Sequence, residues 1–302
     1  MWNRKLLYCG ICLSLLFGHH TVMGQQSILD TLEIDGRIKE DSFQASRILI
    51  GQSAITRPSG TLEVSVQNRF WNTPLESEAS FENMRTFIAD RINTRFEVGF
   101  GITNNVTAGV GYATRYESFD AFLKYRVVQQ GEGRLKWPLN LSFYQNGAFR
   151  NKTPGFADIN TSSAGLTTQI LIARKFTENF SFQLSPSYVY GQIVDSFQNG
   201  VSKFLVGFGG RYKLGKKISL AAEYYYYINP PNTNEVYGPF AIGVNWQVRK
   251  LILQFCLSNV DKLVEDKILG ATARNFNFRD GNLHFGFQAT YLLNLQKKEL
   301  LN

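Results

Sequence analysis

The stretch TLEVSVQNRFW, residues 61–71, alternates between apolar and polar side chains. Leu62, Val64 and Val66 fall on one face of an extended chain, and Glu63 falls on the other. Successive side chains of a β-strand point to opposite faces of its sheet, so this alternation predicts a strand with one apolar face and one polar face.

The same alternation recurs along the chain on both sides of this stretch. The sequence predicts twelve such strands, at residues 61–71, 92–101, 106–112, 119–127, 137–145, 164–176, 180–190, 203–214, 218–228, 240–248, 251–259 and 282–293.

The connections between these segments alternate in length. The long ones are residues 72–91, 146–163, 191–202, 229–239 and 260–281. The short ones are residues 102–105, 177–179, 215–217 and 249–250, while 113–118 and 128–136 are intermediate. An even number of strands with short turns at one end and long loops at the other is typical of outer-membrane barrels. The sequence therefore predicts an all-β fold: a transmembrane antiparallel β-barrel of about 12 strands, with short periplasmic turns and long extracellular loops.

The composition agrees with this fold class. Aromatic residues make up 14% of the 302 residues and charged residues 19%, which favours strands. After Gly24 no stretch of 18 apolar residues occurs, and only helices and closed barrels satisfy the backbone in lipid. Tyrosines near the predicted strand ends, Tyr212, Tyr226 and Tyr227 among them, are interpreted as parts of two interfacial girdles.

The first residues have the features of an export signal. Arg4 and Lys5 precede an apolar run over residues 6–17, and we expect cleavage near Gly24. The predicted location is therefore the outer membrane. The expected parts of the chain are a signal peptide at 1–24, an N-terminal periplasmic or lumen-inserted segment at 25–58, the barrel at 59–295 and a tail at 296–302.

Charged side chains fall on the polar face of the predicted strands. A charge that faces lipid costs about 2–4 kcal/mol at the membrane midplane, so we expect these groups to face the lumen. They are Arg69, Arg95, Glu97, Asp120, Lys124, Arg126, Arg211, Lys213 and Glu223. Two interpretations stay open: ion pairs that fill a narrow lumen, or a positive surplus that selects small anionic solutes. Arg211 or Lys213 could reach Glu223 on the neighbouring strand, depending on register.

The sequence contains few of the side chains that catalysis usually requires. Without the signal region, His284 and Cys256 are the remaining histidine and cysteine. A serine hydrolase needs a histidine beside its nucleophile, whereas Leu283 and Phe285 flank His284. A zinc site needs several such ligands together. We therefore expect no enzyme activity, no catalytic residue, no metal or cofactor, and no nucleic-acid partner.

Several short motifs, in their order, resemble a family of predicted outer-membrane β-barrel proteins of unknown function common in Bacteroidota. They are EVGFGITN at 97–104, DAFLKY at 120–125, LIARKF at 171–176 and GFGGRYKL at 207–214. The resemblance covers most of residues 43–293 and implies a fold and a location. It implies no activity. Arg249, Lys250 and Leu251 stand where the family pattern leads us to expect a Gly-Gly-His-type turn.

Two functions from different classes remain. The first is a passive, porin-like channel for small solutes through a narrow barrel with a charge-paired lumen. The alternative is a non-transporting barrel that binds a periplasmic or surface partner through loops such as 72–91 and 260–281. The expected partners are outer-membrane lipid, the barrel-insertion machinery during assembly and, for a channel, a small anionic solute.

Overall fold

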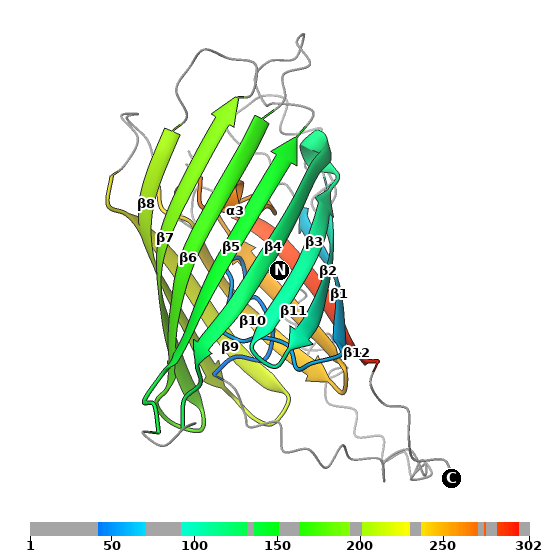
Figure 1. Ribbon diagram of the computed structural model, residues 1–302, viewed down its shortest axis with the longest axis vertical. Coiled ribbons are helices and arrows are strands. Elements are labelled where there is room, and N and C mark those ends of the chain that lie inside the picture. The colour runs from blue at the N-terminus through cyan, green and yellow to red at the C-terminus, as the bar shows by residue number, and fades with distance from the viewer. Residues whose placement is uncertain are drawn as a thin grey trace, which may run out of the picture. The chain divides into compact units, whose positions relative to one another are not determined.

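Twelve antiparallel strands form a closed barrel, in which each strand pairs with its neighbours in sequence and β1 pairs with β12 (Figure 1). The computed structural model describes residues 42–70, 92–131, 136–150, 163–193, 201–229, 237–270, 275 and 283–295. The strands are β1 Thr61–Phe70, β2 Ile92–Thr103, β3 Val106–Ala113, β4 Ser118–Val128, β5 Asn140–Arg150, β6 Ser163–Lys175, β7 Phe180–Ile193, β8 Val201–Lys213, β9 Ile218–Tyr227, β10 Phe240–Val248, β11 Leu251–Ser258 and β12 His284–Asn294. The predicted twelve-stranded antiparallel barrel is confirmed.

The strands present apolar side chains outward and polar side chains inward. In β4, Phe119 is 54% exposed and Leu123 is 45% exposed, whereas Asp120 and Lys124 on the other face are buried. This distribution is the reverse of that in a water-soluble protein, where large apolar side chains are buried. An apolar outer band around a polar interior is the arrangement that a lipid environment requires.

Strand β5 is longer than the sequence pattern predicted. It runs to Arg150 instead of ending at residue 145, because residues 146–150 continue the alternation, with Asn146, Ala148 and Arg150 inward, and pair with β4. The turn that contains η3, Arg115–Glu117, is short, although it lies at the end of the barrel from which the long connections start. Tyr227 does not belong to an outer girdle: it is 6% exposed and faces the lumen, whereas Tyr226 faces outward.

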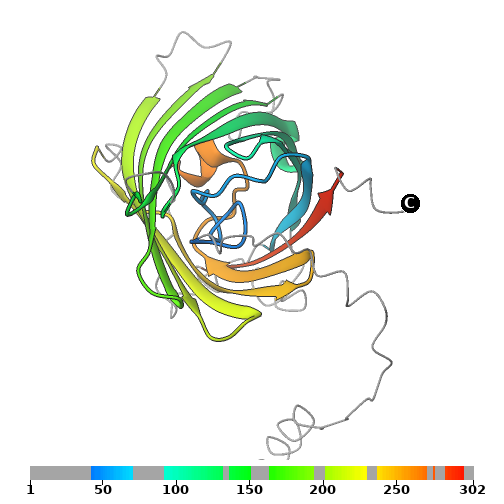
Figure 2. The ribbon, with the colours of Figure 1, turned by 60° about the horizontal axis from the view of Figure 1, so that its bottom comes forward.

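Two parts of the chain outside the strands fill the lumen. The first, here called the lumen segment, is residues 42–58, and the second, the loop segment, is residues 259–270 with the short helix α3, Glu265–Ile268. Figure 2 shows the lumen segment in blue and α3 in orange within the ring of strands.

The loop segment corrects one expectation. Residues 260–281 were expected to form an outer loop, but residues 260–270 turn into the barrel and are largely buried. Residues 25–58 had two expected locations, and of these residues the described part, 42–58, lies in the lumen, while 25–41 lie outside the described residues. Among the residues that the structure describes, no helix is long and apolar enough to cross a membrane.

Apolar side chains from both segments and from the inner wall pack into one buried cluster. The lumen segment contributes Phe43, Ile48, Leu49, Ile50, Ala54 and Ile55, and the loop segment contributes Val260, Ile268 and Leu269. The wall contributes side chains such as Tyr144, Leu171, Leu205 and Tyr225. The interior of the barrel is therefore packed like a protein core over this region.

Candidate functional site

The lumen segment contains a tight hairpin, residues 46–53. Arg47 and Gln52 form an isolated antiparallel bridge, and the N–H of Ile48 donates to the carbonyl of Gly51 at 2.9 Å. A turn of this kind leaves the backbone N–H groups at its tip without partners inside the hairpin. These groups therefore need acceptors from the barrel wall.

Glu223 on β9 supplies those acceptors. Its Oε1 accepts hydrogen bonds from the N–H groups of Leu49 and, at 3.0 Å, Ile50, and its Oε2 accepts one from Gly51 at 3.0 Å. Tyr225 Oη lies 3.5 Å from the same Oε2. One buried carboxylate thus holds the whole tip of the hairpin.

This arrangement differs from the expected contact of Glu223 with a basic residue of β8. The register places Gly209 opposite Glu223, and places Arg211 opposite Ala221. Arg211 Nη1 instead donates to the carbonyl of Ser42 at 3.2 Å. Glu223 and Arg211 therefore both form hydrogen bonds with the backbone of the lumen segment. The alternation within the strands gives no information about this segment.

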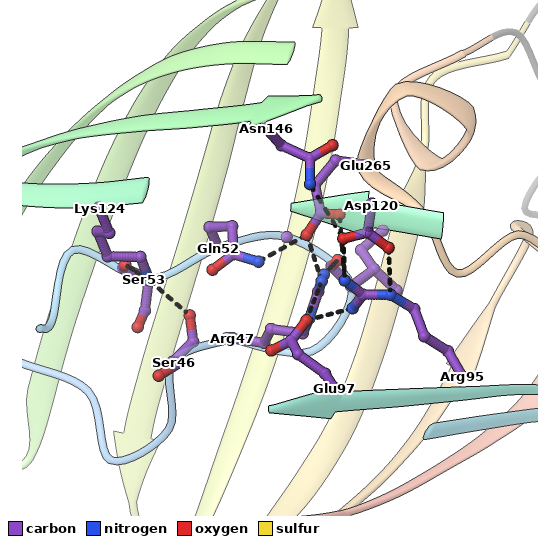
Figure 3. A network of polar contacts seen from close by, with 12 residues as sticks. Ser46, Arg47, Gln52, Ser53, Arg95, Glu97, Asp120, Lys124, Asn146 and Glu265 are labelled. Carbon is purple, nitrogen blue, oxygen red and sulfur yellow. Dashed lines mark hydrogen bonds and ion pairs between the residues drawn. The ribbon is translucent and has the colours of Figure 1, made fainter. Parts of the chain in front are cut away.

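A charge network joins the lumen segment, the loop segment and the wall (Figure 3). Arg47 Nη2 donates to Oε2 of Glu97 at 3.1 Å and to Oε1 of Glu265. Arg95 on β2 donates to Glu97 and to both oxygens of Asp120 on β4, at 3.1 and 2.6 Å. All five side chains are buried, so two guanidinium groups and three carboxylates share one enclosed site.

Amide groups complete this network. Gln52 Nε2 donates to Glu265 Oε1 at 2.6 Å, and Asn146 Nδ2 donates to Asp120 Oδ1 at 3.1 Å. Burial alone would raise the pKa of Glu265, but the positive charges of Arg47 and Arg95 hold this pKa below its usual range. Glu265 is therefore ionised at neutral pH, and its charge binds the loop segment to both arginines.

Polar wall residues bind the backbone of the lumen segment at further points. Lys124 Nζ donates to the carbonyls of Ser46 and Ser53, at 3.1 and 2.9 Å. Gln183 accepts from the N–H of Ala54 at 2.8 Å and donates to the carbonyl of Gln52 at 2.7 Å. These contacts satisfy backbone groups that a segment without strand pairing would otherwise bury unpaired.

A second buried ion pair lies where the lumen segment meets β1. Arg57 Nε donates to Oε2 of Glu63, and Ser46 Oγ donates to the same oxygen at 2.7 Å. The N–H of Arg57 also donates to Thr107 Oγ1 at 2.8 Å. The lumen segment is thus attached to the wall close to the point at which it continues into β1.

The remaining charges predicted to face the lumen have separate positions. Arg69 is buried and lies over Gly286 of β12, where a Cβ would come within 2.7 Å of its Cζ. Arg126 is buried beside the short turn after β2 and donates to the carbonyl of Asn104 at 2.7 Å. Lys213 is half-buried at the end of β8. The structure therefore brings Arg95, Glu97 and Asp120 together, and leaves the other predicted groups at separate points.

Three further ion pairs involve the loop segment, at the end of the barrel where β5 ends and β6 begins. Arg150, the last residue of β5, donates through Nη2 to Oδ1 of Asp266, and both side chains are buried. Arg115 donates to Oδ2 of Asp261, and Lys262 Nζ lies 2.5 Å from Oδ1 of Asp261.

Sequence reasoning did not identify several residues of this site. Arg150 was missed because the predicted strand ended at residue 145, although inward positions 142, 144, 146 and 148 continue to it. Arg47, Arg57, Glu265 and Asp266 lie outside the strands, where no regular periodicity indicates the direction of a side chain.

The site consists of buried ion pairs, of the amides of Gln52 and Asn146 bonded to carboxylates, and of wall side chains bonded to the backbone of the lumen segment. Within the described ranges, no group of three or more histidine, cysteine or acidic side chains could hold a metal ion.

Residues 43–293 match the model of a family described as membrane bound beta barrel domain (DUF5777). The chain belongs to this family. The resemblance inferred from the sequence motifs is thereby confirmed for the family, while an origin in Bacteroidota stays a prediction. A comparison with curated proteins finds no match.

Solved structures of membrane proteins are similar to this barrel at low sequence identity. An outer membrane channel from Pseudomonas putida F1 is 11% identical, with 80% of this chain and 98% of that chain covered and a TM-score of 0.47. The NanC porin is 10% identical, with 76% and 98% covered and a TM-score of 0.44. Outer membrane phospholipase A from Escherichia coli is 14% identical, with 76% and 91% covered and a TM-score of 0.38.

Proposed function

We propose that the protein is an outer-membrane barrel that acts as a passive, porin-like channel for small solutes and that rests in a closed state. The lumen segment and the loop segment close it. The observation that carries this proposal is the buried ion pair of Arg47 with Glu265, because it joins the two segments inside the barrel.

The attachment of these segments supports a closure that can be released. Side chains of the wall, such as Glu223, Lys124 and Gln183, hold the lumen segment. The barrel itself closes through the pairing of β1 with β12, to which the lumen segment contributes no strand. Release of the segment would therefore leave the barrel intact.

A second candidate is a non-transporting barrel that binds a periplasmic or surface partner. The packed lumen favours it, since a packed interior also suits a protein that never conducts. The described beginning of the loop 260–281 is buried, so binding would depend on other parts of the chain, such as 72–91, which lie outside the described residues.

Recordings of the ionic current through purified protein in planar lipid bilayers test the proposal. We expect the wild type to be closed for most of the time. Arg47→Gln should raise the open fraction at least tenfold, because a loss of about 1.4 kcal/mol from the closed state already shifts the equilibrium by a factor of ten. Arg174→Gln, at an exposed arginine on β6, is the matched control and should leave the recordings unchanged.

A variant that lacks residues 43–57 extends the experiment. We expect it to conduct steadily, because one of the two segments that fill the lumen is gone and the loop segment has lost Arg47, the partner of Glu265. A silent channel in both this variant and Arg47→Gln would exclude the passive channel and leave the partner-binding barrel. A wild type that conducts steadily would contradict the closed resting state.

A further inference from the structure

Asp266 of the loop segment lies against the inner wall of β5 and β6. Its carboxylate accepts a hydrogen bond from Nη2 of Arg150, and the two side chains are 2% and 1% exposed. Gly165 of β6 leaves room for it, because a Cβ at this position would lie 2.9 Å from the Cβ of Asp266 and closer still to its carboxylate. Ala148, opposite Gly165 in the register, is also small.

Positive charge predominates around this carboxylate. Nη1 of Arg150 has no hydrogen-bond partner among the described residues. Asp266 also attracts two lysines: Lys267, the next residue, and Lys203, which is half-buried on β8. Burial is the main cause that lowers the pKa of Lys267; Asp266 opposes this shift, and the charge of Arg150 adds to it. Three cationic side chains, those of Arg150, Lys203 and Lys267, thus attract the carboxylate of Asp266 in a site with little access to water.

The wall beside Arg150 carries further polar atoms without partners. Within the described part of the chain, Ser163 Oγ, directly opposite Arg150, has no hydrogen-bond partner. The same holds for Asn146 Oδ1 and Thr167 Oγ1, which lie opposite each other further along the same two strands. A buried polar atom without a partner is unfavourable because its desolvation is not compensated. The part of the inner face of β5 and β6 beside Arg150 is therefore better suited to a hydrophilic occupant than to the cover that it has in the closed state.

We propose that Arg150, Lys203 and Lys267 form a binding site for small carboxylate anions, and that Asp266 occupies this site as an internal ligand in the closed state. The guanidinium group can hold a carboxylate through two parallel hydrogen bonds, and Asp266 uses only one of its nitrogens. A free carboxylate that replaces Asp266 could use both. This inference rests on the closed lumen proposed above and names the solute class that would pass it.

Two variants vacate the site by different means. Asp266→Asn removes the charge of the internal ligand at nearly constant size. Gly165→Ala keeps the charge and displaces the side chain, because the new methyl group would overlap it. Both should lower the apparent Tm of the purified protein. Succinate should then raise the apparent Tm of each variant by about 2–4 °C in a saturable manner, as expected for a ligand that binds the folded state.

Sodium chloride at matched ionic strength is the control for screening, and it should not restore the Tm. The double variant Asp266→Asn with Arg150→Gln should not respond to succinate, because the guanidinium group is absent. A failure of succinate to act on both single variants would overturn the proposal, and so would an equal response of the double variant.

The wild type provides a second measurement that needs no folded variant. The amides of Ile268 and Leu269 donate to the carbonyls of Val264 and Glu265 in α3. Displacement of Asp266 by succinate should speed their hydrogen exchange several-fold over that in matched sodium chloride. An unchanged exchange rate would overturn the proposal if both single variants fail to fold. Neither measurement records current, so failure of anion binding is distinguishable from failure of the closed channel.

Discussion

Arg47 and Glu265 form a buried ion pair although they lie 218 positions apart in the sequence. Arg47 belongs to the hairpin that precedes the first strand, and Glu265 belongs to α3, which precedes the last strand. Removal of one partner from a buried ion pair typically costs about 3–5 kcal/mol, because it leaves an uncompensated charge. Each segment in the lumen therefore stabilises the position of the other.

Acidic pH should loosen the loop segment. Burial favours a raised pKa for Glu265, but Arg47 and Arg95 hold this pKa below its usual range. A carboxyl whose pKa is lowered by folding contributes stability above the unfolded pKa and loses it as the pH falls through the folded pKa. The protection of α3 against hydrogen exchange, measured relative to an unstructured chain at the same pH, should accordingly be lower at pH 3 than at pH 7.

Glu265→Gln is the control for this pH dependence. The variant should show low protection at α3 at both pH values, since it lacks the group that titrates. Equal or higher protection of the wild-type helix at pH 3, or an equal pH response in the variant, would contradict the role given to Glu265.

Glu223→Gln should release the tip of the lumen hairpin. The amide nitrogen of glutamine cannot accept a hydrogen bond, so one of the N–H groups of Leu49, Ile50 or Gly51 would face another donor. The expected cost is about 1–3 kcal/mol, measured as faster hydrogen exchange at these three amides with little change in the strands. Glu178→Gln, at an exposed turn position, should have no such effect. Unchanged exchange at the tip would refute this role.

A methyl group at position 51 should expel the hairpin from its place. The Cβ of Gly51→Ala would lie 2.7 Å from Glu223 Oε2 and 2.9 Å from the ring of Tyr225. Overpacking of this kind usually costs about 1–3 kcal/mol, which a urea unfolding curve of the purified protein would detect. Gly147→Ala is the matched control, because no atom lies within 4 Å of its added Cβ. Equal stability of the two variants would contradict close packing at the tip.

Cysteine labelling should reveal the orientation of the barrel. Glu117 lies in the turn between β3 and β4, at the end of the barrel where β5 ends at Arg150. Lys216 lies in the turn at the opposite end. If the end of the barrel that carries Lys216 faces the periplasm, an impermeant thiol reagent on intact cells should label Glu117→Cys and not Lys216→Cys. The reverse result would invert the orientation, and wild-type Cys256 is buried and should give little background.

Strand parity placed much of the candidate site in advance. The sequence assigned Arg95, Glu97 and Asp120 to the polar face of their strands, and the structure joins them in one network. It also suggested Arg211 or Lys213 beside Glu223, which the observed register does not provide. Parity specifies the face to which a side chain points, but the level of that side chain along the barrel depends on strand pairing.

A barrel with an apolar outside and a charged inside follows directly from the sequence, because each strand carries the alternation within about ten consecutive residues. The partners of those inward charges depend on the packing of the whole chain. Arg47 and Glu265 lie in segments without a regular repeat, and their meeting depends on how two distant parts of the chain pack into one enclosed volume. Local periodicity carries no information about such packing, because it arises from contacts between residues that are remote in sequence.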